Sequence, residues 1–262
     1  MEHQSFFQRM LNIFLAPTEA FKDLTESVTW RDWVWPLVFI SVVLAVAPRF
    51  FQDIKLDETM RMINRQEKAL LDNPNIPDDR KADIQERFDD GRTNINEARE
   101  NPWKLKNQWG YILLPVYLFI FFSVWSLLLL VIGNFGMGGK STFFQVFTVV
   151  ALSYYIGGNG MLMQMSEGIG SLELIIKTPL IMAKESTQIL FSPGLFMDST
   201  ASFLGRFINQ FDIFRLWSVI VLGIGFATLY KRSYATGVWT VGALWLALTA
   251  LGAGLMGLFP GA

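Results

Sequence analysis

The chain has 262 residues, of which 52% are hydrophobic and only 17% are charged, and its net charge is -1. Soluble domains usually carry about 25% charged residues, so this deficit predicts long uncharged stretches, and the near-zero net charge excludes a bulk attraction to nucleic acid. The chain has no cysteine and one histidine, His3, so we expect no disulfide, no metal site, no bound cofactor and no Ser-His-Asp triad.

Uncharged stretches dominate the second half of the chain. No charged residue occurs over 107–139, 141–166 or 233–262. Each stretch exceeds the roughly 20 residues that a helix needs to cross about 30 Å of hydrocarbon. The sequence therefore predicts an all-α, polytopic integral membrane protein.

An amphipathic segment, 1–32, comes first. Within it, QSFFQRMLNIFL at 4–15 places its apolar residues at helical spacing, with the polar residues on the opposite side. Such a helix either lies on a membrane surface in contact with lipid or packs against the protein's own helices. Both alternatives remain open from the sequence.

Five membrane-spanning helices are predicted within a membrane domain covering 33–262. Their expected ranges are 33–51, 109–132, 143–165, 213–230 and 234–258. An odd number of helices places the two termini on opposite sides of the membrane. The basic residues near the ends of these helices on the N-terminal side are Arg9, Lys22, Arg31, Lys140, Lys231 and Arg232. The positive-inside rule then favours a cytoplasmic N-terminus in a bacterial cytoplasmic membrane.

The segment 53–107 is dense in charges of both signs and interrupts the membrane pattern. Apolar residues recur at near-heptad spacing on both sides of the turn NPNIP, in which each proline disfavours helix in the residue before it. We expect an inserted extramembrane helical hairpin, preferentially on the outer side. It is the most probable docking element for a protein partner, because it is the only large exposed structure that the sequence predicts.

A second mixed segment covers 167–211. Its apolar stretch is broken by charged residues and by Pro179. This composition predicts one or two helices that lie at the membrane interface and contact lipid, and no further span.

The stretch GNFGMGGKST at 133–142 ends as a phosphate-binding loop does. The phosphate loop requires glycine five residues before its Gly-Lys-Ser/Thr, but Asn134 occupies that position in front of Gly139 and Lys140. A predicted membrane helix also precedes the stretch where the motif needs a β-strand. We therefore expect no nucleotide binding, and a tight glycine turn in which Lys140 lies at the cytoplasmic face and Ser141 or Thr142 caps the next helix.

Two further groups of polar or small residues are candidates for function or packing. Asp212 and Arg215 stand three positions apart at the start of a predicted span, close enough to pair on one helix face. The sequence GGNG over 157–160 permits a kink or a close helix crossing. Its members are Gly157, Gly158, Asn159 and Gly160.

Three stretches carry a resemblance to a known family. They are PTEAF at 17–21, GMGGKSTFFQVFTVVALSYY at 136–155 and FDIFRLWSVIVLGIGFATLYKRS at 211–233. Together they resemble the Yip membrane-protein family, named for interaction with Ypt/Rab-type GTPases, and the short N-terminal region is similar to its bacterial branch. The resemblance implies a five-helix membrane domain with a cytoplasmic N-terminus and supplies no catalytic residues. The hairpin and GGNG depart from the family pattern, and the GTPase role does not transfer to a bacterium.

These features predict a non-enzymatic membrane protein, an accessory or scaffold subunit of a transport or envelope complex. One alternative is an autonomous transporter or channel for a small solute, permeating past the GGNG kink. Another is a membrane-shaping protein acting through its amphipathic and interfacial helices.

Overall fold

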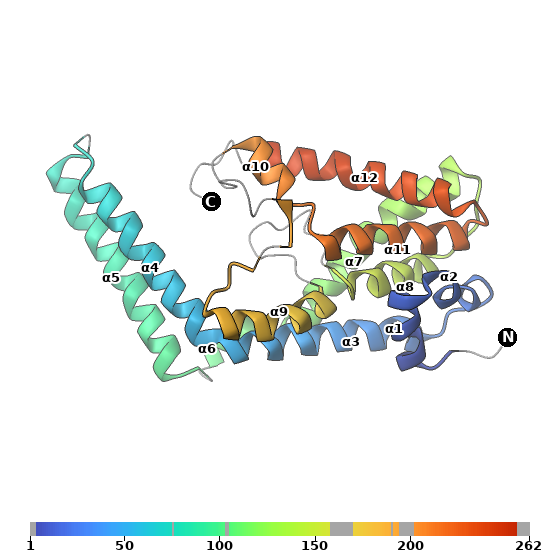
Figure 1. The fold of residues 1–262 in the computed structure, drawn as a ribbon, viewed down its shortest axis with the longest axis horizontal. Coiled ribbons are helices and arrows are strands. Elements are labelled where there is room, and N and C mark those ends of the chain that lie inside the picture. The colour runs from blue at the N-terminus through green and yellow to red at the C-terminus, as the bar shows by residue number, and fades with distance from the viewer. Residues whose placement is uncertain are drawn as a thin grey trace. The chain divides into compact units, whose positions relative to one another are not determined.

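The computed structural model describes residues 4–74, 76–102, 105–157, 170–189, 191–193 and 202–255, and only the backbone of 105–108. All regular elements in these ranges are helices (Figure 1). The chain divides into two compact units, which we describe separately. The first unit comprises 1–44, 115–176 and 190–262, and the second comprises 45–114 and 177–189.

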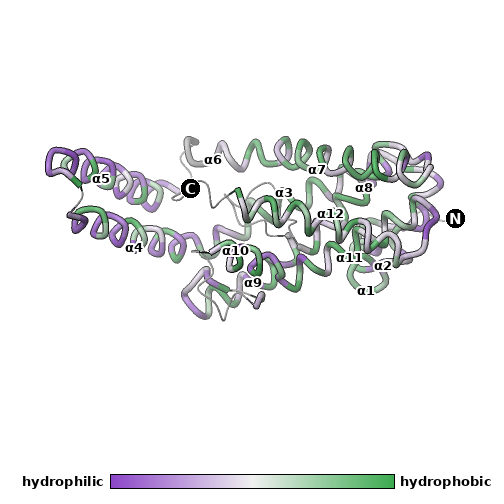
Figure 2. The backbone as a smooth tube through the Cα atoms, turned by 90° about the horizontal axis from the view of Figure 1, so that it is seen from above, coloured by the Kyte–Doolittle hydropathy of each residue, from purple (hydrophilic) through white to green (hydrophobic). Residues whose placement is uncertain are grey.

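Nine helices lie wholly or partly in the first unit among the described residues. They are α1 (Phe6–Leu15), α2 (Pro17–Ala20), α3 (Trp30–Val46), α7 (Leu114–Val131), α8 (Phe143–Tyr154), α9 (Ser171–Lys184), α10 (Phe203–Ile208), α11 (Ile213–Leu229) and α12 (Tyr234–Leu255). Figure 2 shows that α7, α8 and α12 are mainly hydrophobic along their length.

Three helical runs in the described part of the chain are long and apolar enough to cross a membrane. They are Trp30–Leu71, which contains α3, Leu114–Gly136, which contains α7, and α12 itself. Two other apolar helices, α8 and α11, have 12 and 17 residues and are shorter than such a span. The all-α prediction is confirmed for the described residues, and three helices meet the requirements of a span.

Helix α11 is central to the first unit and packs beside α12 along much of its length (Figure 1). The two backbones approach closely because glycines meet at the crossing. A Cβ on Gly237 would lie 2.2 Å from the Gly223 carbonyl oxygen, and a Cβ on Gly223 would lie 2.5 Å from Cα of Val238. Both distances are shorter than any tolerated contact, so only glycine permits this packing.

A third glycine, Gly225, allows close packing on another side of α11. A Cβ on Gly225 would lie 2.5 Å from Cγ1 of Val149 on α8 and 3.1 Å from the Phe21 ring. Phe21 is fully buried there. The segment that follows α2 is therefore part of the protein core, although the sequence placed it before the first membrane helix.

Helix α8 begins where expected but ends early. Thr142 caps it in a reciprocal box with Gln145, whose backbone N–H donates to the Thr142 hydroxyl. At the other end, the N–H of Leu172 donates to the Tyr155 carbonyl at 2.8 Å, and the N–H of Glu173 donates to the Ile156 carbonyl at 3.2 Å. The N–H groups at the start of α9 thus occupy carbonyls that would accept hydrogen bonds from the next turn if α8 continued.

The helix predicted over 143–165 therefore begins as expected but is wrong at its C-terminal end, because α8 ends at Tyr154 and a turn follows. Residues 158–165 lie outside the described part of the chain. In the mixed segment 167–211, the structure describes α9, which contains Pro179, and α10, which Ser202 caps through the Gly205 N–H.

The second unit contains a helical hairpin formed by α4 (Gln52–Leu71) and α5 (Asp78–Glu100), followed by α6 (Leu105–Ile112). Helices α4 and α5 lie side by side and are mostly hydrophilic (Figures 1 and 2). The two helices bury few side chains in the seam between them: Ile95, which is 8% exposed, is the one buried residue that they contribute in the described part of the chain. A Cβ on Gly91 would lie 3.3 Å from Cδ1 of Ile63, which places these two residues opposite each other.

Ion pairs flank this seam. Arg92 of α5 pairs with Glu67 of α4 and with Asp89 on its own helix at 2.6 Å, and Arg99 pairs with Asp57. Ion pairs at the surface contribute at most about 1 kcal/mol each to stability. They therefore determine the register of the hairpin more than they stabilise it.

Glu58 of α4 joins the hairpin to the chain that follows α9. Its Oε1 accepts hydrogen bonds from the Ser186 hydroxyl at 2.8 Å and the Thr187 N–H at 3.1 Å, and its Oε2 accepts from the Thr187 hydroxyl. Partial burial raises the pKa of Glu58, but the hydrogen bonds from Thr187 and Ser186 lower it more. The net pKa therefore lies below its ordinary value of 4.5.

We expect Gly237→Ala to destabilise the protein by about 1–3 kcal/mol, because the new methyl overpacks the α11–α12 crossing. Gly242→Ala on the same helix is the matched control, since its Cβ meets nothing within 4 Å, and it should be neutral or stabilising. The measurement is the midpoint of thermal unfolding in detergent. Equal midpoints for the two variants would show that the crossing is not closely packed.

The Glu58 contacts should make stability depend on pH. Because folding lowers this pKa, the stabilising contribution is fully present above the ordinary value near 4.5 and is lost as pH falls through the folded-state value. Wild type should therefore unfold at a higher temperature than Glu58→Gln at pH 7, and the gap should close on acidification. Glu86→Gln, at an exposed position of α5, should show no such gap at either pH.

Candidate functional site

The loop 132–142 follows α7 through a π-helical turn over Ile132–Gly136. Three of its backbone amides donate hydrogen bonds within the loop. The N–H groups of Met137 and Gly139 both donate to the Gly133 carbonyl, at 3.3 and 3.1 Å, and the Ser141 N–H donates to the Asn134 side chain at 3.1 Å. Amides used in this way do not form a phosphate-binding cradle.

An aromatic ring occupies the space between the loop glycines. Cβ atoms on Gly133 and Gly139 would lie 2.0 and 2.1 Å from ring atoms of Tyr230, which is at the end of α11. Arg232 also donates to the Met137 carbonyl at 2.5 Å. Gly133 and Gly139 of GNFGMGGKST are therefore required for packing against the turn between α11 and α12.

Lys140 itself is exposed in this loop. The expected cap of the next helix is Thr142, one of the two alternatives that the sequence allowed. Asn134, the residue that breaks the phosphate-loop spacing, also donates from Nδ2 to the Ser141 carbonyl at 3.0 Å and so clamps the loop at two points.

The other sequence candidates lie near the start of α11. Asp212 is buried and caps α11 by accepting the Phe214 N–H at 2.9 Å. The Arg215 guanidinium donates to the Gln210 side chain. These hydrogen bonds of Asp212 and Arg215 thus involve different partners. Helix capping explains why Asp212 stands at the N-terminus of α11.

Gly157 lies at a close crossing of chain segments. A Cβ on it would lie 2.5 Å from the Phe214 carbonyl carbon, and a Cβ on Gly170 would lie 2.4 Å from Cα of Gly157. The predicted close approach is therefore present at Gly157. The remaining candidates Gly158, Asn159 and Gly160 lie outside the described residues.

Sequence reasoning missed the burial of Glu173. This residue is 1% exposed at the start of α9, and its carboxylate accepts the Gly170 N–H at 3.3 Å. A charged residue inside an apolar segment predicts an interfacial position, and only the early end of α8 brings Glu173 into the core instead.

A second buried charge lies in α1. Arg9 is 2% exposed, and its Nη2 contacts Oδ2 of Asp23 at 2.5 Å and Oδ1 of Asp32 at 3.3 Å. Asp32 also accepts from the Thr29 N–H and hydroxyl, at 2.7 and 2.8 Å, in the first turn of α3. The ion cluster therefore ties the N-terminal helix to the beginning of α3.

The buried and exposed residues of α1 are distributed differently from the sequence prediction, because Arg9 is buried. Met10 and Ile13 are buried beside Arg9, whereas Phe7 is 78% and Leu15 is 66% exposed. One side of this helix thus packs against the protein, as one of the two alternatives predicted, and an apolar side remains uncovered. Contact of that side with lipid stays a prediction.

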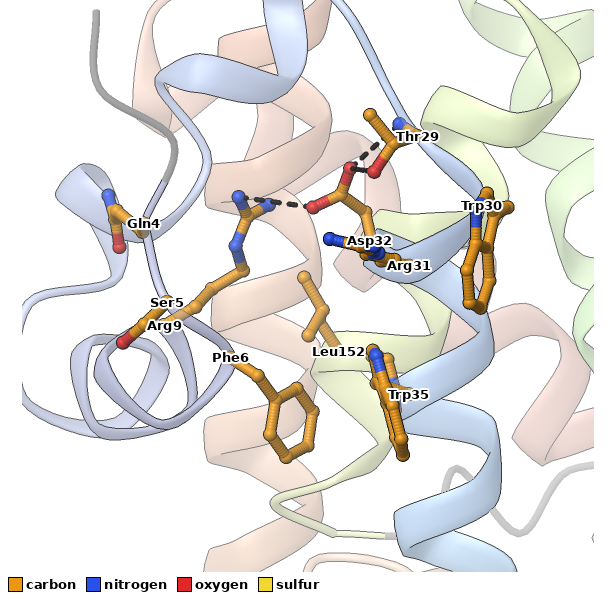
Figure 3. Close-up of a pocket in the computed structure, with 11 residues that line it drawn as sticks. Gln4, Ser5, Phe6, Arg9, Thr29, Trp30, Arg31, Asp32, Trp35 and Leu152 are labelled. Atoms are coloured by element: carbon orange, nitrogen blue, oxygen red, sulfur yellow. Dashed lines mark hydrogen bonds and ion pairs between the residues drawn. The ribbon is translucent and has the colours of Figure 1, made fainter.

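A pocket of about 520 Å³ opens between α1 and the start of α3 (Figure 3). Its size is within the usual range of small-molecule sites. The pocket has a polar end formed by Arg9, Asp32 and Thr29 and an apolar end at Phe6 and Trp35 (Figure 3). The sequence contains all of these residues, but it gives no indication that 4–9 and 29–36 face each other.

The chain matches no protein-family model, and no curated protein or solved structure is significantly similar to it. The resemblance to the Yip family rests on the three sequence stretches alone.

We expect Gly139→Ala to destabilise the protein by about 1–3 kcal/mol, because its methyl would overlap the Tyr230 ring. Lys140→Ala, the neighbouring exposed position, should leave the unfolding midpoint within about 0.5 kcal/mol of wild type. Magnesium ATP should not raise the midpoint of either variant or of wild type. A nucleotide-dependent rise that Lys140→Ala abolished would restore the phosphate-loop interpretation.

Proposed function

We propose that this protein is a non-enzymatic, multi-pass protein of a bacterial cytoplasmic membrane that serves as an accessory or scaffold subunit of a transport or envelope complex. The α4–α5 hairpin is its docking element. The membrane domain has five helices, α3, α7, α8, α11 and α12, in an arrangement like that of the Yip family, with a cytoplasmic N-terminus and the hairpin outside.

The observation that carries this proposal is the contrast between the two units. The first is built from apolar helices whose outward side chains are also apolar, such as Val42 on α3, Val116 on α7 and Trp239 on α12. The second presents a long charged hairpin with a minimal core of its own. Exposed apolar helices require lipid, and an isolated charged hairpin with little core suits recognition of another protein.

Contacts at one end of the first unit support the proposed topology. Arg232 reaches the Met137 carbonyl, and Gln145 Nε2 donates to the Leu24 carbonyl at 2.9 Å. The N-terminal segment, the α7–α8 loop and the α11–α12 turn therefore lie together, as three cytoplasmic segments would. These segments also carry the six basic residues that the positive-inside rule uses.

The segments assigned to the outer side are also joined within their own unit. Glu58 of the hairpin binds Ser186 and Thr187, which follow α9. In the proposed topology both segments emerge on the side opposite to the N-terminus.

A second candidate function is autonomous transport of a small solute. It is favoured by the interruption between α8 and α9, where Glu173 is buried, because broken helices and buried acids are typical of transport pathways. We rank it below the accessory role, because it gives the charged hairpin no task.

The absence of cysteine from the chain permits single-cysteine probes of both topology and docking. Met62→Cys lies on an exposed side of α4, and Lys140→Cys lies in the α7–α8 loop. An impermeant photoactivatable maleimide added to intact cells should label Met62→Cys alone. Irradiation should then join the hairpin to one transport or envelope complex in near-stoichiometric yield.

Labelling of Lys140→Cys from outside would reverse the topology. Cross-links from Met62→Cys to further copies of this chain alone would contradict the accessory role. Solute flux into proteoliposomes that contain only this protein would in that case support transport.

A further inference from the structure

The pocket between α1 and α3 changes in polarity along its length. Thr29 and Asp32 lie at its polar end, and Trp35 follows on the next turn of α3 (Figure 3). Leu152 of α8 also contributes to the apolar part. Polarity therefore falls in the direction in which α3 continues into its uncharged stretch, which is the direction from headgroups to acyl chains in the proposed membrane placement.

The polar end contains a buried donor that needs an acceptor. Nη1 of Arg9 has no contact with solvent and no hydrogen-bond partner within the described ranges of the chain. Leaving a buried guanidinium N–H unpaired is costly. A ligand oxygen at this end would remove that cost once the side chains that now cover Nη1 shift enough to admit it.

The same end of the pocket can also accept a hydrogen bond from a ligand. The Asp32 carboxylate accepts from Arg9 and twice from Thr29, whereas a carboxylate has about four lone-pair sites. The aromatic rings of Trp30 and Trp35 line the pocket beside it. A carboxylate next to aromatic faces is an environment that favours an ammonium group.

The charges at this end are balanced and do not favour a simple anion. Arg9 carries one positive charge, and Asp23 and Asp32 each carry one negative charge. Arg31, whose guanidinium lies 5.5 Å from the Trp30 ring centroid, supplies the second positive charge that balances them. A zwitterion that carries a phosphate and a primary ammonium matches this arrangement, with its phosphate toward Arg31 and Nη1 of Arg9 and its ammonium toward Asp32.

We propose that this pocket is a binding site for a phospholipid with a primary-amine headgroup, of the phosphoethanolamine type. The headgroup binds between Arg9, Arg31 and Asp32, and the upper part of the acyl chains contacts Phe6 and Trp35. The site rests on the membrane placement given under the proposed function, but it does not depend on a protein partner or on the hairpin.

The test is native mass spectrometry of the full chain, delipidated in mild detergent and titrated with three lipids that have identical acyl chains. These carry ethanolamine, choline or glycerol on the phosphate. We expect the ethanolamine lipid to be retained about tenfold more tightly than the other two, since choline has no N–H to donate to Asp32 and glycerol has no cation.

Two variants outside the buried ion cluster test the site without endangering the fold. Arg31→Gln and Trp35→Ala should each weaken retention of the ethanolamine lipid by about threefold to tenfold. Lys140→Gln, another exposed basic residue, and Trp239→Ala, a tryptophan that is 76% exposed on α12, are the matched controls and should not change it. Unfolding midpoints of all four variants verify that they remain folded.

Equal retention of the three lipids, or tighter retention of the glycerol lipid, would overturn the proposal. An unchanged affinity in both Arg31→Gln and Trp35→Ala would also do so. Displacement of the lipid by an equal concentration of free phosphoethanolamine would show that the site takes a soluble compound and not a lipid. None of these outcomes bears on hairpin cross-linking, so the two proposals fail independently.

Discussion

Close approach of helix backbones at the glycines of α11 is the constraint on which the first unit depends. Gly223 allows α12 to pack closely against α11, and Gly225 allows both α8 and Phe21 to do so. Lipid gives helices no hydrophobic reason to associate, so backbone proximity and the dispersion contacts that it allows must supply the attraction. One helix with small residues on two faces can therefore hold three other segments, and the remaining apolar surface of those segments is left to face outward.

The turn at the end of α11 extends this constraint to the loops. Tyr230 enters the space that Gly133 and Gly139 leave open, and Arg232 fixes the same loop through the Met137 carbonyl. Helix packing and loop conformation are thus coupled through one aromatic ring. Gly138, with φ of 68°, supplies the left-handed residue that the loop needs to reverse direction.

The sequence predicted those features that depend on local patterns. Uncharged stretches located α7 and α12, the proline-rich turn separated α4 from α5, and Thr142 was one of two named caps for α8. The loop sequence was enough to exclude a phosphate site, because Asn134 breaks the required spacing. Each of these inferences needs only neighbours within a few residues or one helix length.

Features that depend on distant contacts were missed for a physical reason. Arg9 was assigned to the polar side of α1, and no local signal shows that Asp23 and Asp32 return to meet it. The early end of α8 depends on N–H groups from α9, and the burial of Glu173 follows from that ending. The pocket combines both difficulties, because its two walls come from the distant segments 4–9 and 29–36, and their meeting depends on a buried ion pair.

That ion pair has a role other than simple stabilisation. Burying a guanidinium is costly, and two carboxylates repay that cost only when their geometry holds all three groups in place. The contacts of Arg9 with Asp23 and Asp32 act together with the burial of Met10 and Ile13 to hold one orientation of α1. In this orientation Phe7 and Leu15 face outward, and Phe6 faces Trp35 across the pocket. The buried charges therefore contribute both to the apolar face that α1 leaves uncovered and to the shape of the pocket beside it.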